Sequence, residues 1–206
     1  MLPFIHSFSN LTIINEDVLK IDPKVLLQEH KEISEIYGYK VVANLPYYVA
    51  SPVIRHFLEA SVKPQIMVVM VQKEVAREIT AKPGKLSLQG IGVQVYGEPK
   101  IISYVPARNF YPAPEVDSAI LRITVYPEPL VAPADSEGFF RMARAGFSAA
   151  RKQIANSLAQ GLDLPKDEIL PLLKKAGILP QRRAETLSIE EWIRLRRVYA
   201  DSVGAG

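Results

Sequence analysis

The sequence predicts an α/β fold for its first two thirds and an all-helical segment for the rest. Short apolar runs alternate with helix-periodic segments as far as residue 126, which is typical of a parallel sheet with helices on its faces. Pro127, Pro129 and Pro133 then interrupt the chain, and neither a central strand nor a helix interior continues through such a stretch. We therefore predict two domains, residues 1–127 and residues 128–206.

The expected elements of the first domain follow the apolar pattern in order. We predict strands at residues 11–15 (LTIIN), 40–43 and 66–71, and helices at residues 23–37, 52–60 and 73–81. Two further strands, at residues 101–105 and 118–126, are close enough in sequence to form an antiparallel pair. Residues 86–97 (LSLQGIGVQVYG) are ambiguous, because their β-branched residues favour a strand.

The second domain contains helix signals only. We predict helices from residue 135, over residues 149–160, from Pro165 and from residue 188 to residue 199. Asp167 and Glu168 would occupy the first turn that follows Pro165, and Ser188 and Glu191 have the spacing of a capping box.

The composition excludes several classes of protein. At 206 residues the chain can bury a full core. It has no cysteine, which excludes disulfides, thiol nucleophiles and Cys-ligated zinc, and fits a reducing cytoplasm. Its three histidines show no metal-ligand spacing, and its apolar runs are too short to cross a bilayer. We expect a soluble, cytoplasmic protein without a metal.

Basic residues gather in one part of the second domain. The net charge is only +3, which alone is weak support for a polyanionic partner. Between residues 138 and 162, however, Arg141, Arg144, Arg151 and Lys152 occur without any acid, on predicted helices. This stretch is either a surface for nucleic-acid phosphates or an ordinary solvated helix face.

The tetrapeptide Asn44, Leu45, Pro46 and Tyr47 follows a predicted buried strand. Ligands of open α/β sheets bind at the carboxyl ends of strands, although the same residues also suit a simple turn. The Asn44 carboxamide and a backbone carbonyl of residues 45–46 could accept both N–H bonds of an exocyclic adenine amine and free its lone pair for attack. Tyr47 could stack on a base taken out of its helix.

Five blocks in this order resemble one family. NLPYYVAS, VQKEVAREITAKPG, VPARNFYPAPEVDSAILR, FSAARKQIANSL and RAETLSIEEW are similar to the KsgA-type ribosomal RNA small-subunit adenine dimethyltransferases. The resemblance implies a Rossmann-like class I methyltransferase sheet followed by a small all-α domain. It also favours a helix over residues 86–97. The implied activity is S-adenosylmethionine-dependent dimethylation of N6 of two adjacent adenosines in the 3′-terminal hairpin of 16S rRNA.

The resemblance also implies roles for individual residues. Asn44, Leu45, Pro46 and Tyr47 match the amine-presenting motif, and Phe110 matches the aromatic on the opposite side of the target base. Asp17, together with Asn44, would contact the cofactor. The residues expected to contact rRNA are Arg108, Arg141, Arg144, Arg151 and Lys152. The chain departs from the family at Ala150, where an arginine is usual.

A larger departure concerns the family's opening elements. The first strand, the glycine-rich loop and the second strand with its ribose-binding acid are not found in this sequence. We expect an N-terminally truncated form of an enzyme that is monomeric at full length, with weak binding of S-adenosylmethionine. In its sheet, residues 11–15 would pair directly with residues 40–43, or else an open slot would remain. The alternatives are a non-catalytic rRNA-binding assembly factor and a related methyltransferase of 23S rRNA or DNA adenine.

Overall fold

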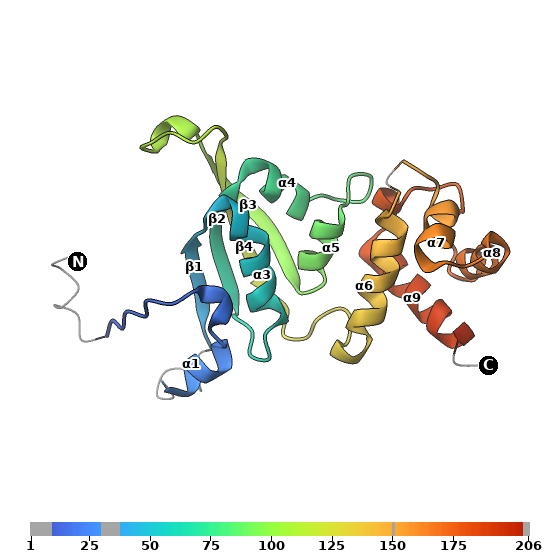
Figure 1. Ribbon diagram of the computed structural model, residues 1–206, viewed down its shortest axis with the longest axis horizontal. Helices are drawn as coiled ribbons and strands as arrows, with labels where there is room; N and C mark the ends of the chain where they lie inside the picture. Colours follow the sequence, from blue (N-terminus) through green and yellow to red (C-terminus); the bar gives the residue numbers. More distant parts are fainter. Residues whose placement is uncertain (1–9, 30–37, 150, 204–206) are drawn as a thin grey trace.

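The computed structural model describes residues 10–29, 38–149 and 151–203. A four-stranded sheet carries α3, α4 and α5 on one face, and a separate group of helices follows toward the C-terminus (Figure 1). Within the part of the chain so described, no helix combines the length and the hydropathy of a membrane-spanning segment.

The sheet is mixed, with the strand order β1-β2-β4-β3. The strands are β1 (Lys40–Asn44), β2 (Ile66–Gln72), β3 (Gly97–Val105) and β4 (Ser118–Val125). β1 and β2 are parallel, whereas β4 is antiparallel to both β2 and β3. The carboxyl ends of β1, β2 and β3 therefore lie at the same end of the sheet, which we call the carboxyl edge.

The helices fall into two groups. Those near the sheet are α1 (Pro23–Glu29), α3 (Ala50–Glu59), α4 (Lys73–Ile79) and α5 (Leu88–Gln94). Those of the C-terminal group are α6 (Pro133–Phe147), α7 (Ile154–Leu162), α8 (Lys166–Lys175) and α9 (Ile189–Val203). Among the described residues the short 3₁₀ turns are η2 (Val18–Lys20), η3 (Tyr47–Val49), η4 (Ala107–Asn109) and η5 (Ala184–Thr186).

Most of the elements predicted from the sequence are present. The predicted strands 40–43 and 66–71 and the antiparallel pair β3 and β4 are confirmed. The ambiguous segment forms the helix α5, where Ser87 Oγ accepts a hydrogen bond from Gly90 N at 3.0 Å. A Cβ at Gly90 would come within 2.8 Å of Glu78 O, so this glycine allows α5 to lie close to the end of α4. β3 begins at Gly97, four residues before the expected start, and includes Pro99, which an edge strand tolerates.

The predicted strand at residues 11–15 is wrong. These residues have no regular structure, and the Ile13 side chain is 61% exposed. Of the two outcomes expected for the sheet, direct pairing of residues 11–15 with residues 40–43 is wrong, because β1 pairs only with β2 among the described residues, and the outer side of β1 has no described strand beside it. On the open outer strand, Val42 is 81% exposed. An isolated apolar segment cannot form a strand without a neighbour to satisfy its backbone groups.

Two predicted helices depart most from the structure, whereas the others differ by one to four residues at their ends. Of the helix predicted at residues 23–37, α1 covers Pro23–Glu29, and residues 30–37 lie outside the described residues. The helix predicted at 149–160 starts only at Ile154, because Gln153 is extended (ψ 148°) and Lys152 N closes a turn on Ala149 O at 2.9 Å. Arg151 and Lys152 therefore lie in a turn and not on a helix.

The capping box at the last helix is confirmed. Ser188 N donates to Glu191 Oε2 at 2.8 Å, and Glu191 N donates to Ser188 Oγ at 3.2 Å. α8 begins directly after Pro165, with Asp167 and Glu168 in its first turn as predicted. Both helix starts therefore follow from local chemistry that the sequence carries.

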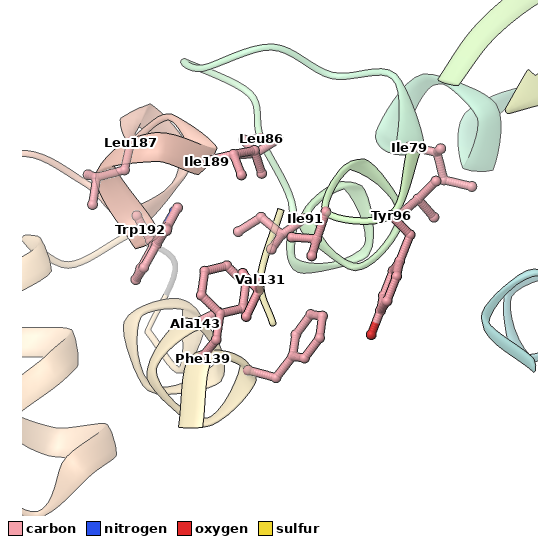
Figure 2. Packing of buried hydrophobic residues seen from close by; sticks show 14 of the residues in the cluster. Ile79, Leu86, Ile91, Tyr96, Val131, Phe139, Ala143, Leu187, Ile189 and Trp192 are labelled. Atoms are coloured by element: carbon pink, nitrogen blue, oxygen red, sulfur yellow. The ribbon is translucent and has the colours of Figure 1, made fainter. Parts of the chain in front are cut away.

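One continuous apolar core joins the sheet part to the C-terminal helices. Figure 2 shows Ile91 of α5 near Phe139 and Ala143 of α6, with Trp192 of α9 to their left. All four side chains are almost fully buried. The packing extends across the domain boundary that we predict at residue 127, so the position of α6 is fixed relative to α5.

Candidate functional site

The tetrapeptide Asn44–Tyr47 begins at the carboxyl end of β1. Leu45 N donates to Met70 O of β2 at 3.4 Å, and the Leu45 side chain is buried. Val49 N donates to Pro46 O at 3.1 Å, which closes the turn η3 and leads directly into α3. Leu45 therefore anchors the motif while Asn44 is exposed at the edge of the sheet.

Tyr47 is hydrogen-bonded to the first residue of β4. Its Oη lies 2.7 Å from Ser118 Oγ, a hydroxyl on a residue with no exposed surface. A buried hydroxyl needs a hydrogen-bond partner, and Tyr47 supplies one. This bond joins two segments that are 71 residues apart in the sequence.

Asp117, the neighbour of Ser118, holds the base of the loop that carries Phe110. Its Oδ2 accepts from Lys73 Nζ at 3.0 Å, and its Oδ1 accepts from Ala107 N at 3.1 Å. The hydrogen bond from Lys73, then that from Ala107, and the nearby charge of Arg108 all hold the pKa of Asp117 below its ordinary value. The carboxylate is therefore ionised at neutral pH and ties both ends of the loop to α4.

The Phe110 loop projects from the sheet at the edge where the tetrapeptide lies (Figure 1). Phe110 is half-buried, and its N donates to Ala107 O at 3.1 Å. Arg108 lies in the same loop, on η4. The structure thus connects the tetrapeptide, the predicted amine-presenting motif, to the Phe110 loop through Ser118 and Asp117.

The acceptors at this edge can be distinguished. The Pro46 carbonyl already accepts from Val49 N, whereas among the described residues no backbone N–H donates to the Leu45 carbonyl. Asn44 Oδ1 and Leu45 O are therefore the pair best suited to receive two N–H bonds of one amine.

Asp17 occupies a different position. Its Oδ1 accepts from Leu19 N at 3.0 Å and caps η2. The chain then runs along the later part of α3, where Ile21 O lies 2.8 Å from His56 Nε2. No hydrogen bond joins Asp17 to Asn44 within the described residues.

The predicted RNA-binding arginines of α6 are exposed. Arg144 lines a cavity of about 420 Å³ between α6, α3 and α5, together with Ser51 and Arg55 of α3. Ser51 lies in the first turn of α3, which follows the tetrapeptide, so this cavity extends from the neighbourhood of the motif toward α6. Arg141 is exposed on α6 one turn before Arg144.

Arg151 and Lys152 lie beyond the C-terminal end of α6. Both are exposed, and Lys152 Nζ donates to Gln160 Oε1 of α7 at 3.1 Å. Among the described residues, no ion pair involves Arg141, Arg144, Arg151 or Lys152. These four cations are therefore free of carboxylate partners.

Three residues that hold the site together by hydrogen bonds are not predicted from the sequence. Lys73, Asp117 and Ser118 stand inside two of the quoted blocks, VQKEVAREITAKPG and VPARNFYPAPEVDSAILR. The only signal for them was their position, Lys73 shortly after one predicted strand and Asp117 and Ser118 at the start of another. Their partners are distant in sequence, and no spacing rule reveals them.

Comparison with known proteins identifies the relatives of the chain. The family model described as "Ribosomal RNA adenine dimethylase" matches residues 4–201. The ribosomal RNA small subunit methyltransferase A of Dehalococcoides mccartyi is 47% identical over 196 residues, which cover 95% of this chain and 65% of the relative. The protein of the same name from Bacillus mycoides is 42% identical, over 91% of this chain and 65% of the relative. The chain thus spans about 65% of the length of these relatives.

Two solved structures share the fold. The 23S rRNA methyltransferase ErmE has a TM-score of 0.68 at 25% identity and covers 94% of this chain and 74% of its own. A dimethyladenosine transferase from Plasmodium falciparum has a TM-score of 0.77 at 19% identity. The match covers 96% of this chain and 75% of the Plasmodium chain. These likenesses confirm the predicted α/β methyltransferase fold. Since the family model spans nearly the whole sequence, the chain belongs to the ribosomal RNA adenine dimethylase family.

Proposed function

We propose that this protein takes part in S-adenosylmethionine-dependent methylation of N6 of two adjacent adenosines in the 3′-terminal hairpin of small-subunit rRNA. The observation that carries the proposal is the placement of Asn44 and Leu45 at the end of β1, in a motif that Tyr47, Ser118 and Asp117 connect to the loop of Phe110. The identity with small-subunit enzymes supports the choice of substrate over 23S rRNA.

The residues of this chain would position the reacting amine. Asn44 Oδ1 and Leu45 O would each accept one N–H of the adenine amine, which turns its lone pair out of conjugation with the ring. Tyr47 and Phe110 would hold the base between two aromatic faces, and base stacking of this kind contributes about 1 to 3 kcal/mol per base. As the N–CH3 bond forms, the S–CH3 bond of the bound donor would break, S-adenosylhomocysteine would leave, and the nitrogen would release a proton to water. No strong base is required, so positioning would supply most of the acceleration.

S-adenosylmethionine, when bound, supplies an electrophilic methyl group. The described residues fit it in part. Asn44 is exposed at the carboxyl ends of the strands, and Asp17 Oδ2 makes no hydrogen bond among the described residues. A carboxylate oxygen is a suitable acceptor for the adenine amine of the cofactor. Binding would bring Asp17 and Asn44 to the same ligand, although no hydrogen bond joins them here.

The free cations would hold the rRNA backbone. Arg108 lies in the loop of Phe110, and Arg144 lines the cavity that borders the first turn of α3. Arg141, Arg151 and Lys152 continue the positive charge around the end of α6. Contacts of this kind position an RNA without reading its sequence.

The test is methyl transfer by the product of the complete reading frame that encodes this chain. Small subunits that lack the modification would be incubated with tritiated S-adenosylmethionine, and the modified bases mapped by primer extension. We expect label in the small-subunit RNA, with stops at two adjacent adenosines of the 3′ hairpin. Label in 23S rRNA alone would favour the large-subunit alternative. Binding to the subunit without any label would favour a non-catalytic assembly factor.

A further inference from the structure

Tyr104 of β3 has two cations of α4 against its ring. Lys73 Nζ lies 5.7 Å from the ring centroid, and Arg77 Cζ lies 5.8 Å from it. Both distances fall in the range of cation–π contacts. Because Lys73 and Arg77 are four residues apart on one helix, they share a face of α4. The two cations therefore reach Tyr104 from the α4 side.

The rest of the ring is open. Tyr104 is 49% exposed, and it lies on β3, which is an edge strand of the sheet. Its register partner on β4 is Ala119, whose side chain is too small to cover a ring. The half of the ring that faces away from α4 is therefore accessible to a ligand.

The charges around the ring are not balanced. Lys73 forms an ion pair with Asp117 at 3.0 Å, but no ion pair of the described residues involves Arg77. Arg77 is also exposed. A guanidinium without a carboxylate partner, beside an accessible aromatic ring, can pair with a phosphate in a bidentate manner.

A short chain of contacts connects this cluster to the candidate site. Lys73 touches both Tyr104 and Asp117, and Asp117 precedes Ser118, which binds Tyr47. Tyr104 also stands one residue before the end of β3, at the edge where β1 ends. A nucleotide on Tyr104 would therefore be a near neighbour of a base held by Tyr47.

We propose that Tyr104, Arg77 and Lys73 form a second nucleotide subsite. An unpaired base that flanks the target adenosine would stack on the open side of the Tyr104 ring, and Arg77 would bind its phosphate. Lys73 stays on Asp117 and polarises the ring. Unpaired loop nucleotides are recognised in this way because every base has a π-face and every nucleotide a phosphate. The inference rests on the proposed function, since it assumes an RNA substrate with a single-stranded loop.

The test uses the 206-residue chain and two fluorescein-labelled RNAs of equal length. One is a hairpin whose loop contains two adjacent adenosines, and the other is a fully paired duplex. We expect Tyr104→Ala to weaken hairpin binding about tenfold, as the loss of one stacked base predicts, and to leave duplex binding unchanged. Tyr104→Phe keeps the ring and should bind the hairpin like the wild type. Arg77→Ala should make the salt dependence of hairpin affinity shallower by about one phosphate contact. Lys175→Ala on the distant α8 should leave this salt dependence unchanged.

The outcomes separate this inference from the proposed function. If the wild type prefers the hairpin and Tyr104→Ala retains that preference in full, the subsite is overturned and the proposed function stands. If the wild type binds both RNAs equally, the proposed function itself is in doubt and the subsite falls with it. Thermal melting would first establish that each variant is folded. Should Tyr104→Ala unfold, Tyr104→Leu keeps apolar bulk without an aromatic face and should show the same loss.

Discussion

The hydroxyls of Tyr47 and Ser118 lie 2.7 Å apart and join the tetrapeptide Asn44–Tyr47 to the first residue of β4. Ser118 is fully buried and Tyr47 is half-buried. Through this bond, the segment that would hold the target base is connected to Asp117 and to the loop of Phe110. The two sides of the candidate site therefore depend on each other.

We expect Tyr47→Phe to lower the free energy of unfolding by about 1 to 3 kcal/mol, because it leaves the buried Ser118 hydroxyl without a partner. Ser118→Ala in the same background should recover part of that loss, since both polar groups are then absent. Urea unfolding of both single variants and the double variant gives the coupling energy directly. Additive effects would show that the bond contributes nothing.

The second prediction concerns the reacting amine. Asn44→Ala should abolish methyl transfer by the product of the complete reading frame and leave its affinity for small-subunit rRNA largely intact. The reason is that the substitution removes one acceptor of the adenine amine and no phosphate contact. Filter binding and tritium incorporation would be measured side by side. Equal loss of binding and of transfer would contradict the role assigned to Asn44.

A third prediction tests the turn between α6 and α7. Replacing Arg151 and Lys152 together by alanine should weaken RNA binding at every sequence and make its salt dependence shallower by about two phosphate contacts. The matched control is the pair Lys174 and Lys175 at the end of α8, which are also exposed. An unchanged salt slope would identify the turn as an ordinary solvated surface.

The fourth prediction concerns pH. Arg182 donates to both carboxylate oxygens of Glu191, at 2.5 and 3.0 Å. This contact, followed by the hydrogen bond from Ser188 N, holds the pKa of Glu191 below its ordinary 4.5. The folded-state pKa is depressed, so the stabilisation is fully present above the unfolded pKa and is lost as the pH falls through the folded pKa.

Glu191→Gln should therefore be less stable than the wild type at about pH 6 and lose less of its stability on acidification to about pH 3. Urea midpoints at both pH values provide the measurement. Arg182→Met should flatten the pH dependence in the same way, because it removes the main cause of the low pKa. A wild-type stability that is constant over this range would refute the assignment.

The sequence predicted the elements whose partners are close or whose pattern is self-sufficient. β2 alternates buried Met67, Val69 and Val71 with less buried neighbours, and the α9 start is encoded by a local capping box. Residues 11–15 have an equally apolar pattern, yet they form no strand. A strand is a property of a pair, and the pattern of one segment cannot show whether a neighbour is present.

The same distinction applies to the candidate site. The tetrapeptide was recognised because its position after a strand is a local property. Asp117 and Ser118 were missed because their roles come from Lys73 and Tyr47, which lie 44 and 71 residues away. Arg151 and Lys152 fall within the helix predicted at residues 149–160, but the extended Gln153 prevents the helix from starting before Ile154.

The last prediction tests how closely α6 and α9 pack. A Cβ at Gly146 of α6 would collide with the ring of Trp192, which also stacks with Phe147 at a centroid distance of 5.8 Å. Trp192 is almost fully buried. Gly146→Ala should therefore lower the free energy of unfolding by about 1 to 3 kcal/mol through overpacking, even though alanine is the better helix former.

Gly92→Ala on α5 is the matched control, because a Cβ there meets nothing within 4 Å, and it should stabilise the protein by about 0.5 to 1 kcal/mol. Trp192 is the only tryptophan. Its fluorescence should therefore change in Gly146→Ala, where α9 is displaced, and stay unchanged in Gly92→Ala. Since Arg144 lies two residues before Gly146, RNA binding should weaken in Gly146→Ala if α6 shifts. A Gly146→Ala protein as stable as the Gly92→Ala protein would show that α6 and α9 are not in this close contact.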